Sequence, residues 1–295
     1  MTRTTVSAAY KLWTELLKGS KSPLTVKKYT QYLKPLVNRL GDFELTELAE
    51  KEGYITGFAL SNYSTNSARR NFWNAWNSFR RFAAKTFKVG LPELPDEFVG
   101  RSEKKEPKPL KDSHFKALLE AVRELPDVES RESGKERNIS LKLAFYLMAF
   151  GGLRLGEALK VRPEHVQFKK TDDGQEYAEV LVKGKGRKER RVPIFYPEVV
   201  AYLKEHAEEL PPALTHQAVE KRLKNIYRKA VVGIGEQPER FYPHRLRDTY
   251  LTRLADRGVD IRVLQELAGH SSIEMTRRYV GVSQEKILKE VQRAF

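Results

Sequence analysis

Cysteine is absent from this sequence of 295 residues, and methionine occurs only three times. Without cysteine the chain can form no disulfide bond, no thiolate zinc site and no cysteine nucleophile. No apolar run is long enough to cross a bilayer, and the first residues lack the apolar core of a secretion signal. We therefore expect a soluble, cytoplasmic protein with no membrane partner. The hydrophobic content of 40% is enough for two packed domains.

Acidic residues are too few to balance the basic ones. The 39 Asp and Glu residues face 54 Lys and Arg residues, which gives a net charge of +15. A charge of this sign and size attracts polyanions and favours a nucleic acid partner. The alternative is a basic surface that is merely solvated, as on a protein from a thermophile.

Apolar residues recur at helical spacing through the first part of the chain, which predicts an all-helical domain over residues 1–90. The most strongly patterned helix is expected at 67–87, where tryptophans and phenylalanines form one stripe. We assign this stripe to the core rather than to base stacking. The basic residues beside it could contact DNA phosphates or could form a solvated face: Arg69, Arg70, Arg80, Arg81 and Lys85.

Residues 91–111 break the helical pattern. This stretch contains four prolines and a charged run without periodicity, so we predict an extended linker between two domains. The domain that follows, 112–295, opens with helices and then changes period. Short strands are expected at 167–170, 177–182 and 189–194, followed by further helices that include a tail helix from about Gln284. The predicted fold class is mainly α with one small antiparallel sheet (α+β).

Two pairs of chemically active residues in this domain have helical spacing. His244 and Arg247 are three residues apart and share one helical face, just after a proline that a helix start tolerates. Arg154 and Glu157 have the same spacing, so the carboxylate could orient the guanidinium. Taken alone, each pair could be a surface coincidence. Arginine suits phosphate chemistry because its planar fork binds phosphate through two hydrogen bonds and stays charged.

Three further features complete a possible site for phosphodiester cleavage. Residues 183–190 form a basic, glycine-containing turn between two expected strands, and this turn could also merely touch a DNA backbone. His270 follows Gly269 at a corner between two helices, and Tyr279 lies further along the chain. Cleavage without a metal needs a nucleophile, cations around the phosphate and an acid for the leaving oxygen. The sequence shows no convincing metal site.

These segments, taken in order, resemble the tyrosine recombinase/integrase family, which includes the Xer and lambda-integrase-like enzymes. Residues 152–157 (GLRLGE) resemble its first arginine box, and 184–193 (GKGRKERRVP) its β-hairpin lysine box. Residues 244–247 (HRLR) resemble its H-x-L-R box, and 267–271 (LAGHS) its L-G-H-S box. The resemblance covers the whole second domain, and the helical first domain resembles the family's core-binding domain. The sequence departs from the common pattern at Asp248, where many members have His.

The resemblance implies roles for the residues and for the protein. Tyr279 would be the nucleophile that forms a 3′-phosphotyrosyl link, Lys185 would protonate the leaving 5′ oxygen, and Glu157 would order the pocket. It also implies DNA contacts by Arg187 and Lys188, a C-shaped clamp around double-stranded DNA, and a tetramer on paired sites formed from monomers near the nucleoid. No metal, ATP or other cofactor would be needed. The remaining pocket residues would stabilise the phosphate or assist proton transfer: Arg154, His244, Arg247 and His270.

Three alternatives to a site-specific recombinase stay open. A nicking and closing enzyme like the type IB topoisomerases would use the same pocket. A DNA-binding relative could carry an idle pocket. A metal-dependent nuclease or transposase would instead lose its activity in a chelator.

Overall fold

The computed structural model describes residues 4–41, 43–99, 106–128, 137–184 and 189–280. The chain divides into two compact units, Met1–Lys104 and Lys105–Phe295, each with its own hydrophobic core. In the described ranges no helix combines the length and the apolar character that crossing a bilayer requires. The tail helix expected from Gln284 lies outside the described residues.

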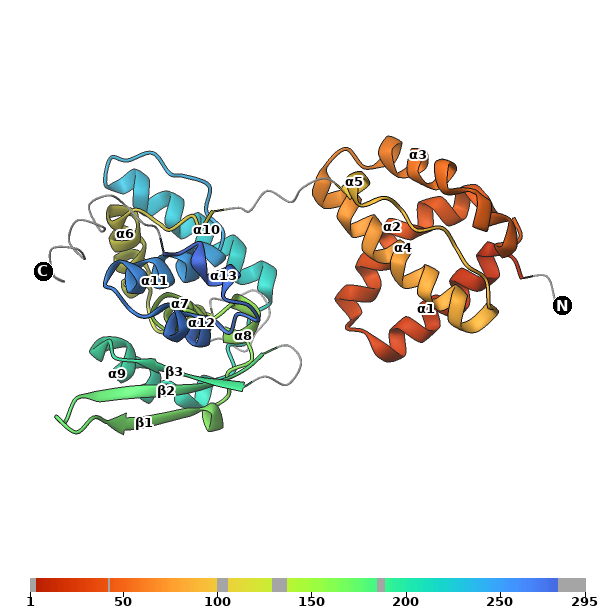
Figure 1. Cartoon of the computed structure of the whole chain (residues 1–295). Helices are drawn as coiled ribbons and strands as arrows, with labels where there is room; N and C mark the ends of the chain where they lie inside the picture. Colours follow the sequence, from red (N-terminus) through yellow and green to blue (C-terminus); the bar gives the residue numbers. More distant parts are fainter. Residues whose placement is uncertain (1–3, 42, 100–105, 129–136, 185–188, 281–295) are drawn as a thin grey trace, which may run out of the picture. The chain divides into compact units, whose positions relative to one another are not determined.

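The first unit is helical, as predicted (Figure 1). Its three longest helices each begin after a hydroxyl residue whose side chain accepts a hydrogen bond from a backbone N–H three residues on: Thr5, Ser22 and Thr65. The helices and the one 3₁₀ segment of this unit are α1 (Val6–Ser20), α2 (Pro23–Leu40), η1 (Leu45–Glu50), α3 (Glu52–Asn62), α4 (Asn66–Phe87) and α5 (Asp96–Val99).

The aromatic stripe of α4 is core, as expected. Trp76 is 1% exposed, and its indole N–H donates to the carbonyl of Pro92 at 2.9 Å. Burial of such a large side chain with its N–H satisfied contributes strongly to the stability of a small helical unit. Helix α4 ends at Lys88, which adopts a left-handed conformation at φ 60°.

The predicted linker, 91–111, is shared between the two units. Leu91, Leu94 and Phe98 are buried in the core of the first unit, so residues 91–99 are not a free linker. The prolines there interrupt helical hydrogen bonding without preventing the leucines from packing. On the other side, Leu110 is buried in the core of the second unit. The predicted boundaries at 90 and 111 therefore lie inside packed structure.

The second unit combines helices with a three-stranded antiparallel sheet in the order β1–β2–β3. The strands are β1 (Val166–Lys170), β2 (Glu176–Lys183) and β3 (Glu189–Ile194), close to the predicted ranges. Val180 pairs with Val192, and both side chains are fully buried on one face of the sheet. Figure 1 shows the sheet along one side of the helices of this unit, with α9 (Pro197–Glu205) beside it.

The helices of the second unit surround α7 (Asn138–Gly151), nearly all of whose residues are buried. Helix α11 (His244–Asp256) packs against α7, and α10 (His216–Gly233) packs against α6 (Asp112–Arg123). The remaining helical segments are α8 (Leu155–Ala158), η2 (Pro163–His165), η4 (Ala207–Glu209), α12 (Ile261–Ala268) and α13 (Glu274–Arg277).

Helix α11 also holds the segment through which the chain enters the second unit. The guanidinium of Arg245 donates to the carbonyl of Lys108 at 2.9 Å and to that of Pro109 at 2.8 Å. The hydroxyl of Thr249 accepts the backbone N–H of Leu110 at 2.8 Å. Because Arg245 and Thr249 are both buried, this segment is fixed to the helix by partly desolvated hydrogen bonds.

Candidate active site

Arg247 is fully buried on α11 and reaches three parts of the second unit. Its guanidinium donates to the carbonyl of Gly152 at 2.6 Å, to the carbonyl of Ala268, and to Nε2 of His270 at 3.2 Å. Its buried Nε has no hydrogen-bond partner among the described residues. Burial and the positive charge of Arg154 lower the pKa of Arg247. The Arg247 guanidinium therefore lies in a positively charged environment, and its Nε–H remains available to donate a hydrogen bond.

Arg154 lies beside Arg247 because of the turn that ends α7. Gly152 ends that helix at φ 63°, where a Cβ atom would lie 2.4 Å from the ring of Tyr250. The chain can therefore turn tightly only with glycine at this position. Arg154 donates to the carbonyl of Ala268 at 3.2 Å, the same oxygen that Arg247 contacts. Two guanidinium groups thus meet at one carbonyl, and Arg154 keeps 38% of its side chain exposed.

Glu157 is the carboxylate of this cluster. It accepts the backbone N–H and the guanidinium of Arg154, both at 2.9 Å, and it also pairs with Arg190 of β3. Burial alone would raise the pKa of Glu157, but the hydrogen bonds from Arg190 and from the Arg154 backbone outweigh it. Together with the two positive charges they lower that pKa to about 2. Glu157 therefore stays ionised at any physiological pH and orients both arginines.

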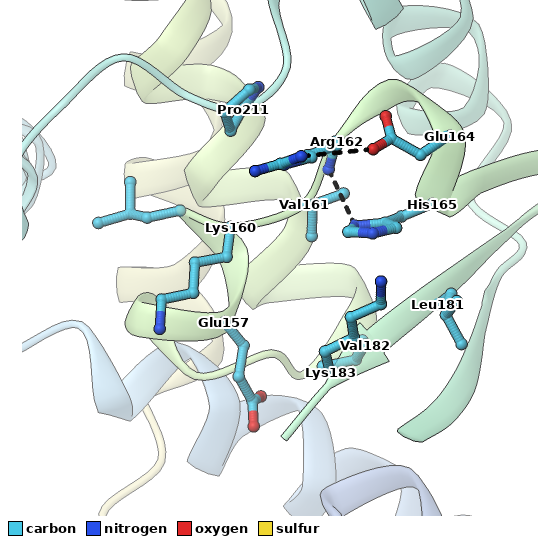
Figure 2. A pocket seen from close by; sticks show the side chains of 11 residues that line it. Glu157, Lys160, Val161, Arg162, Glu164, His165, Leu181, Val182, Lys183 and Pro211 are labelled. Atoms are coloured by element: carbon cyan, nitrogen blue, oxygen red, sulfur yellow. Dashed lines mark hydrogen bonds and ion pairs between the residues drawn. The ribbon is translucent and has the colours of Figure 1, made fainter. Parts of the chain in front are cut away.

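Glu157 also borders a pocket of about 540 Å³ (Figure 2). Figure 2 shows the basic side chains of Lys160, Arg162 and Lys183 around this pocket, with His165 on its wall. Nδ1 of His165 accepts the backbone N–H of Arg162 at 3.2 Å, which fixes the imidazole. The pocket therefore lies next to the arginine cluster, and Glu157 belongs to both.

His270 is held at the corner between α12 and α13. Gly269 ends α12 at φ 57°, and the imidazole of His270 then contacts Arg247 through Nε2 and Thr276 through Nδ1 at 2.9 Å. Burial, followed by the charges of Arg247 and Arg154, lowers the pKa of His270 to about 3. A neutral ring that accepts from Arg247 at Nε2 carries its proton on Nδ1, where it donates to Thr276.

Tyr279 is buried, with 3% of its surface exposed, against the ring of His270. Its hydroxyl donates to Oδ1 of Asp248 at 2.8 Å and accepts from the guanidinium of Arg278 at 3.0 Å. Burial and the negative charge of Asp248 raise the pKa of Tyr279. The phenol is therefore protonated in the free protein.

His244 begins α11, one turn before Asp248, and lies at the edge of the site. Its Nε2 is 3.7 Å from Oδ1 of Asp248, and 43% of its side chain is exposed. Burial lowers the pKa of His244 more than Asp248 raises it. The neutral imidazole can accept a proton.

An open cavity of about 960 Å³ borders one side of this cluster. Arg154, Arg190 and His270 line it, and Gly184 at the end of β2 forms part of its rim. Among the described residues no group of three metal-binding side chains is found. The guanidinium groups on this lining can bind an anion, and the carboxylates of Glu189 and Glu266 lie on the same lining.

The structure brings together most of the predicted site residues, namely Arg154, Glu157, His244, Arg247, His270 and Tyr279. Three others, Lys185, Arg187 and Lys188, lie outside the described residues, in the connection between β2 and β3.

The predicted DNA contacts of the first unit lie on α4. Arg69 donates to the carbonyl of Tyr63, and Arg80 pairs with Glu93. The side chains of Arg70, Arg81 and Lys85 are exposed.

Sequence reasoning missed Arg190 and gave Asp248 no role. Arg190 could have been noticed because it alternates with the buried Val192 and Ile194 along β3 and so faces the core. Asp248 could have been noticed because it follows Arg247 and lies one turn after His244 on the same helix.

A family comparison matches residues 108–286 of the chain to the phage integrase family. The tyrosine recombinase XerC of Bradyrhizobium diazoefficiens is 28% identical over 291 residues, covering 91% of this chain and 86% of that protein. The tyrosine recombinase XerA of Thermococcus kodakarensis is 27% identical over 289 residues, covering 93% and 90%.

Solved structures agree in fold. The XerH site-specific recombinase bound to its difH substrate superposes with a TM-score of 0.70 at 19% identity, over 97% of this chain and 84% of that one. The Tn1549 transposon integrase, in complex with transposon right end DNA, gives 0.64 at 17% identity over 99% of both chains. Since the family match spans more than half of the chain, and since the arginine, histidine and tyrosine cluster lies within it, this chain belongs to the phage integrase family and is a tyrosine recombinase.

Proposed function

We propose that Tyr279 is the nucleophile with which this recombinase cuts and rejoins double-stranded DNA at specific sites. The observation that carries the proposal is the convergence of Tyr279, His270 and Arg247 next to Arg154. The buried Nε of Arg247 has no partner among the described residues, and a phosphate oxygen would supply one. Satisfying a buried charged donor in this way favours binding of the scissile phosphate.

In the proposed reaction, the hydroxyl oxygen of Tyr279 attacks the phosphorus and forms a 3′-phosphotyrosyl bond. Arg154 and Arg247 stabilise the charge on the non-bridging oxygens, and His270 supports this by holding the Arg247 guanidinium through Nε2. Lys185 supplies the proton to the leaving 5′ oxygen. The 5′-hydroxyl of a partner strand then attacks the phosphotyrosine, which rejoins the DNA and frees Tyr279. The covalent bond preserves the energy of the phosphodiester, so the proposed exchange uses no ATP.

Replacing Tyr279 with phenylalanine tests the nucleophile. The Tyr279→Phe protein should form no covalent adduct with DNA on denaturing gels, and its affinity in a mobility-shift assay should stay within about threefold of the wild type. Tyr242→Phe and Tyr250→Phe are the matched controls, and both should still form adducts. Adducts formed by Tyr279→Phe, and lost in one of the other two, would assign the nucleophile to that tyrosine instead.

We further propose that exchange takes place in a tetramer on two paired DNA sites, assembled from monomers. Apolar residues that repeat at helical spacing in the last segment of the sequence favour a docking helix: Ile287, Leu288, Val291 and Phe295. Removal of residues 284–295 should weaken assembly on paired sites more than binding to a single site, as measured by analytical ultracentrifugation with DNA. Unchanged assembly would instead mean that this segment packs on its own protomer.

A further inference from the structure

Asp248 is the one carboxylate that the described structure places against the hydroxyl of Tyr279. Its Oδ1 accepts that hydroxyl at 2.8 Å, and its other oxygen, Oδ2, lies 3.5 Å from the backbone N–H of Lys108. Only 4% of the residue is exposed. A buried carboxylate that accepts the tyrosine hydroxyl at this distance is next to the proton that must leave, which is the requirement for a general base.

We propose that Asp248 is the general base of the cleavage step and takes the proton directly from Tyr279. This inference rests on the proposed role of Tyr279 as the nucleophile. As the bond between the tyrosine oxygen and phosphorus forms, the O–H bond breaks and its proton moves to Oδ1 of Asp248. The bond from phosphorus to the 5′ oxygen breaks at the same time, and the general acid protonates that oxygen. In rejoining, Asp248 returns its proton to the tyrosine oxygen as that oxygen leaves phosphorus.

The contacts of the tyrosine hydroxyl fit this role. The single hydroxyl proton points to Asp248, and Arg278 donates to the same oxygen from another side at 3.0 Å. A phenol oxygen that donates one hydrogen bond and accepts one still has a free lone pair, and this lone pair can attack phosphorus. Arg278 also lies over the tyrosine ring, 5.1 Å from its centre, and can stabilise negative charge that develops on the oxygen.

His244 lies next to Asp248 and not next to the Tyr279 hydroxyl, so it can exchange a proton with Asp248 but not directly with the tyrosine. Its Nε2 lies 3.7 Å from Oδ1 of Asp248, and no hydrogen bond joins it to Tyr279 in the described structure. The neutral imidazole lies near enough to Asp248 to receive the proton from it. The negative charge of Asp248 favours the histidine cation that results, whereas burial opposes it. The charged and titratable groups that face the tyrosine hydroxyl and Asp248 are His244, Arg247, His270 and Arg278.

The raised pKa of Tyr279 indicates at which stage of the reaction its hydroxyl proton is transferred. An ionised Asp248 disfavours a free phenolate beside it, so the tyrosine does not ionise before DNA arrives. Its proton moves only when bonding to phosphorus makes the oxygen more acidic. Asp248 therefore acts during the attack and keeps the unliganded nucleophile protonated.

Single-turnover cleavage by Asp248→Asn tests the proposal. Asparagine has the same shape and can still accept the tyrosine hydroxyl, but it cannot take the proton. We expect the rate of adduct formation on a nicked suicide substrate to fall by about 100-fold, with DNA affinity unchanged. Asp248→His should recover part of the rate, because an imidazole is a base. The matched control is Thr249→Ala, which removes a buried bond of the same helix to the Leu110 backbone and should cleave within about threefold of the wild type.

A DNA substrate with sulfur in place of the leaving 5′ oxygen distinguishes a general base from a general acid. Sulfur leaves without a proton, so this substrate should rescue a Lys185→Ala protein but should leave Asp248→Asn slow. Full rescue of Asp248→Asn, or a wild-type rate on ordinary DNA, would overturn the role of Asp248. If Tyr279→Phe still forms adducts, the proposed nucleophile itself fails. An inactive Tyr279→Phe beside a fully active Asp248→Asn would refute only the present inference.

Discussion

Arg190 and Glu157 form a two-pronged ion pair between β3 and α8. Nη1 of Arg190 lies 3.3 Å from Oε1 of Glu157, and Nη2 lies 2.8 Å from Oε2. Only 5% of the arginine side chain and 11% of the glutamate side chain are exposed. Since Glu157 also binds Arg154, one buried carboxylate connects the sheet to the turn that presents an active-site arginine.

Glu157→Gln should therefore destabilise the second unit in a pH-dependent way. The pKa of Glu157 is lowered from 4.5 to about 2, which corresponds to about 3 kcal/mol of folding free energy. A lowered pKa stabilises the folded state at pH values above the unfolded pKa, and that contribution is lost as the pH falls through the folded one. Urea denaturation should show a loss of about 3 kcal/mol at pH 7 that shrinks between about pH 5 and pH 2.

An exposed glutamate provides the control for this measurement. Glu164 pairs with Arg162 at 3.7 Å, and the two side chains are 63% and 64% exposed. Exposed pairs contribute about 0–1 kcal/mol, so Glu164→Gln should leave the stability almost unchanged at every pH. A loss in Glu157→Gln that stays constant from pH 7 to pH 2 would show that packing, and not charge, holds the pair together.

Gly152→Ala should reduce both stability and cleavage. The residue has φ 63°, and a Cβ atom would lie 2.4 Å from the ring of Tyr250. We expect a loss of at least about 2 kcal/mol from this strain and overlap. Cleavage should slow as well, because the Gly152 carbonyl accepts from Arg247. Thermal denaturation and single-turnover cleavage measure the two effects.

Gly156→Ala is the matched control for that change. Gly156 lies in α8, and an added Cβ atom would have no neighbour within 4 Å. Alanine favours a helix over glycine by about 1 kcal/mol, so this variant should be as stable as the wild type or slightly more stable. Equal destabilisation by the two variants would contradict the steric explanation.

The imidazole of His270 should remain neutral throughout the physiological range in the DNA-free protein. Burial and the nearby arginines lower its pKa to about 3, so its NMR signals should not shift between pH 5 and pH 8. The same residue in the urea-unfolded chain should titrate near about 6.5. A folded-state titration midpoint above pH 6 would show that the ring is not enclosed by the arginines as described.

On the first unit, Arg81 and Lys85 are the strongest candidates for phosphate contacts. Both are exposed on α4 and lie four residues apart, on one face. Replacing both with alanine should weaken binding equally to specific and non-specific DNA. The slope of log affinity against log salt should decrease by about 0.9 for each lost contact.

Arg80→Ala is the comparison for these two substitutions, because Arg80 already pairs with Glu93 at 2.7 Å. Its loss should affect the salt slope less than the loss of Arg81 or Lys85. A salt slope that is unchanged in the Arg81 and Lys85 double variant would remove this face from the DNA interface.

Local signals were sufficient to predict the three strands and most of the helices in the described part of this chain, but not α3 or α5. The change from helical to alternating periodicity located the sheet, and Ser22 with Pro23 marked the start of α2. The linker prediction was wrong in part, because prolines were taken as evidence of an extended chain. Whether Leu91 and Leu94 pack on a neighbouring core depends on contacts distant in sequence, which composition does not reveal.

The candidate site was predictable where helical spacing or a sequence box fixed a residue. The spacing of His244 and Arg247 was enough to place them together on α11. It could not predict that Asp248, on the same helix, would face the hydroxyl of Tyr279 rather than solvent. That contact depends on how α13 returns towards α11, and on burial that removes the carboxylate from water. The pairing of Arg190 with Glu157 likewise depends on the packing of the sheet against α8.

The hydrogen bonds from Arg245 and Thr249 attach the segment 108–110 to α11. The chain from Lys108 onward is therefore part of the packed second unit. A pulling force that reaches the second unit along the chain is therefore borne first by α11. Arg245 is two residues from Arg247 and three from Asp248. The helix that carries these active-site residues is therefore also the helix to which the incoming chain is attached.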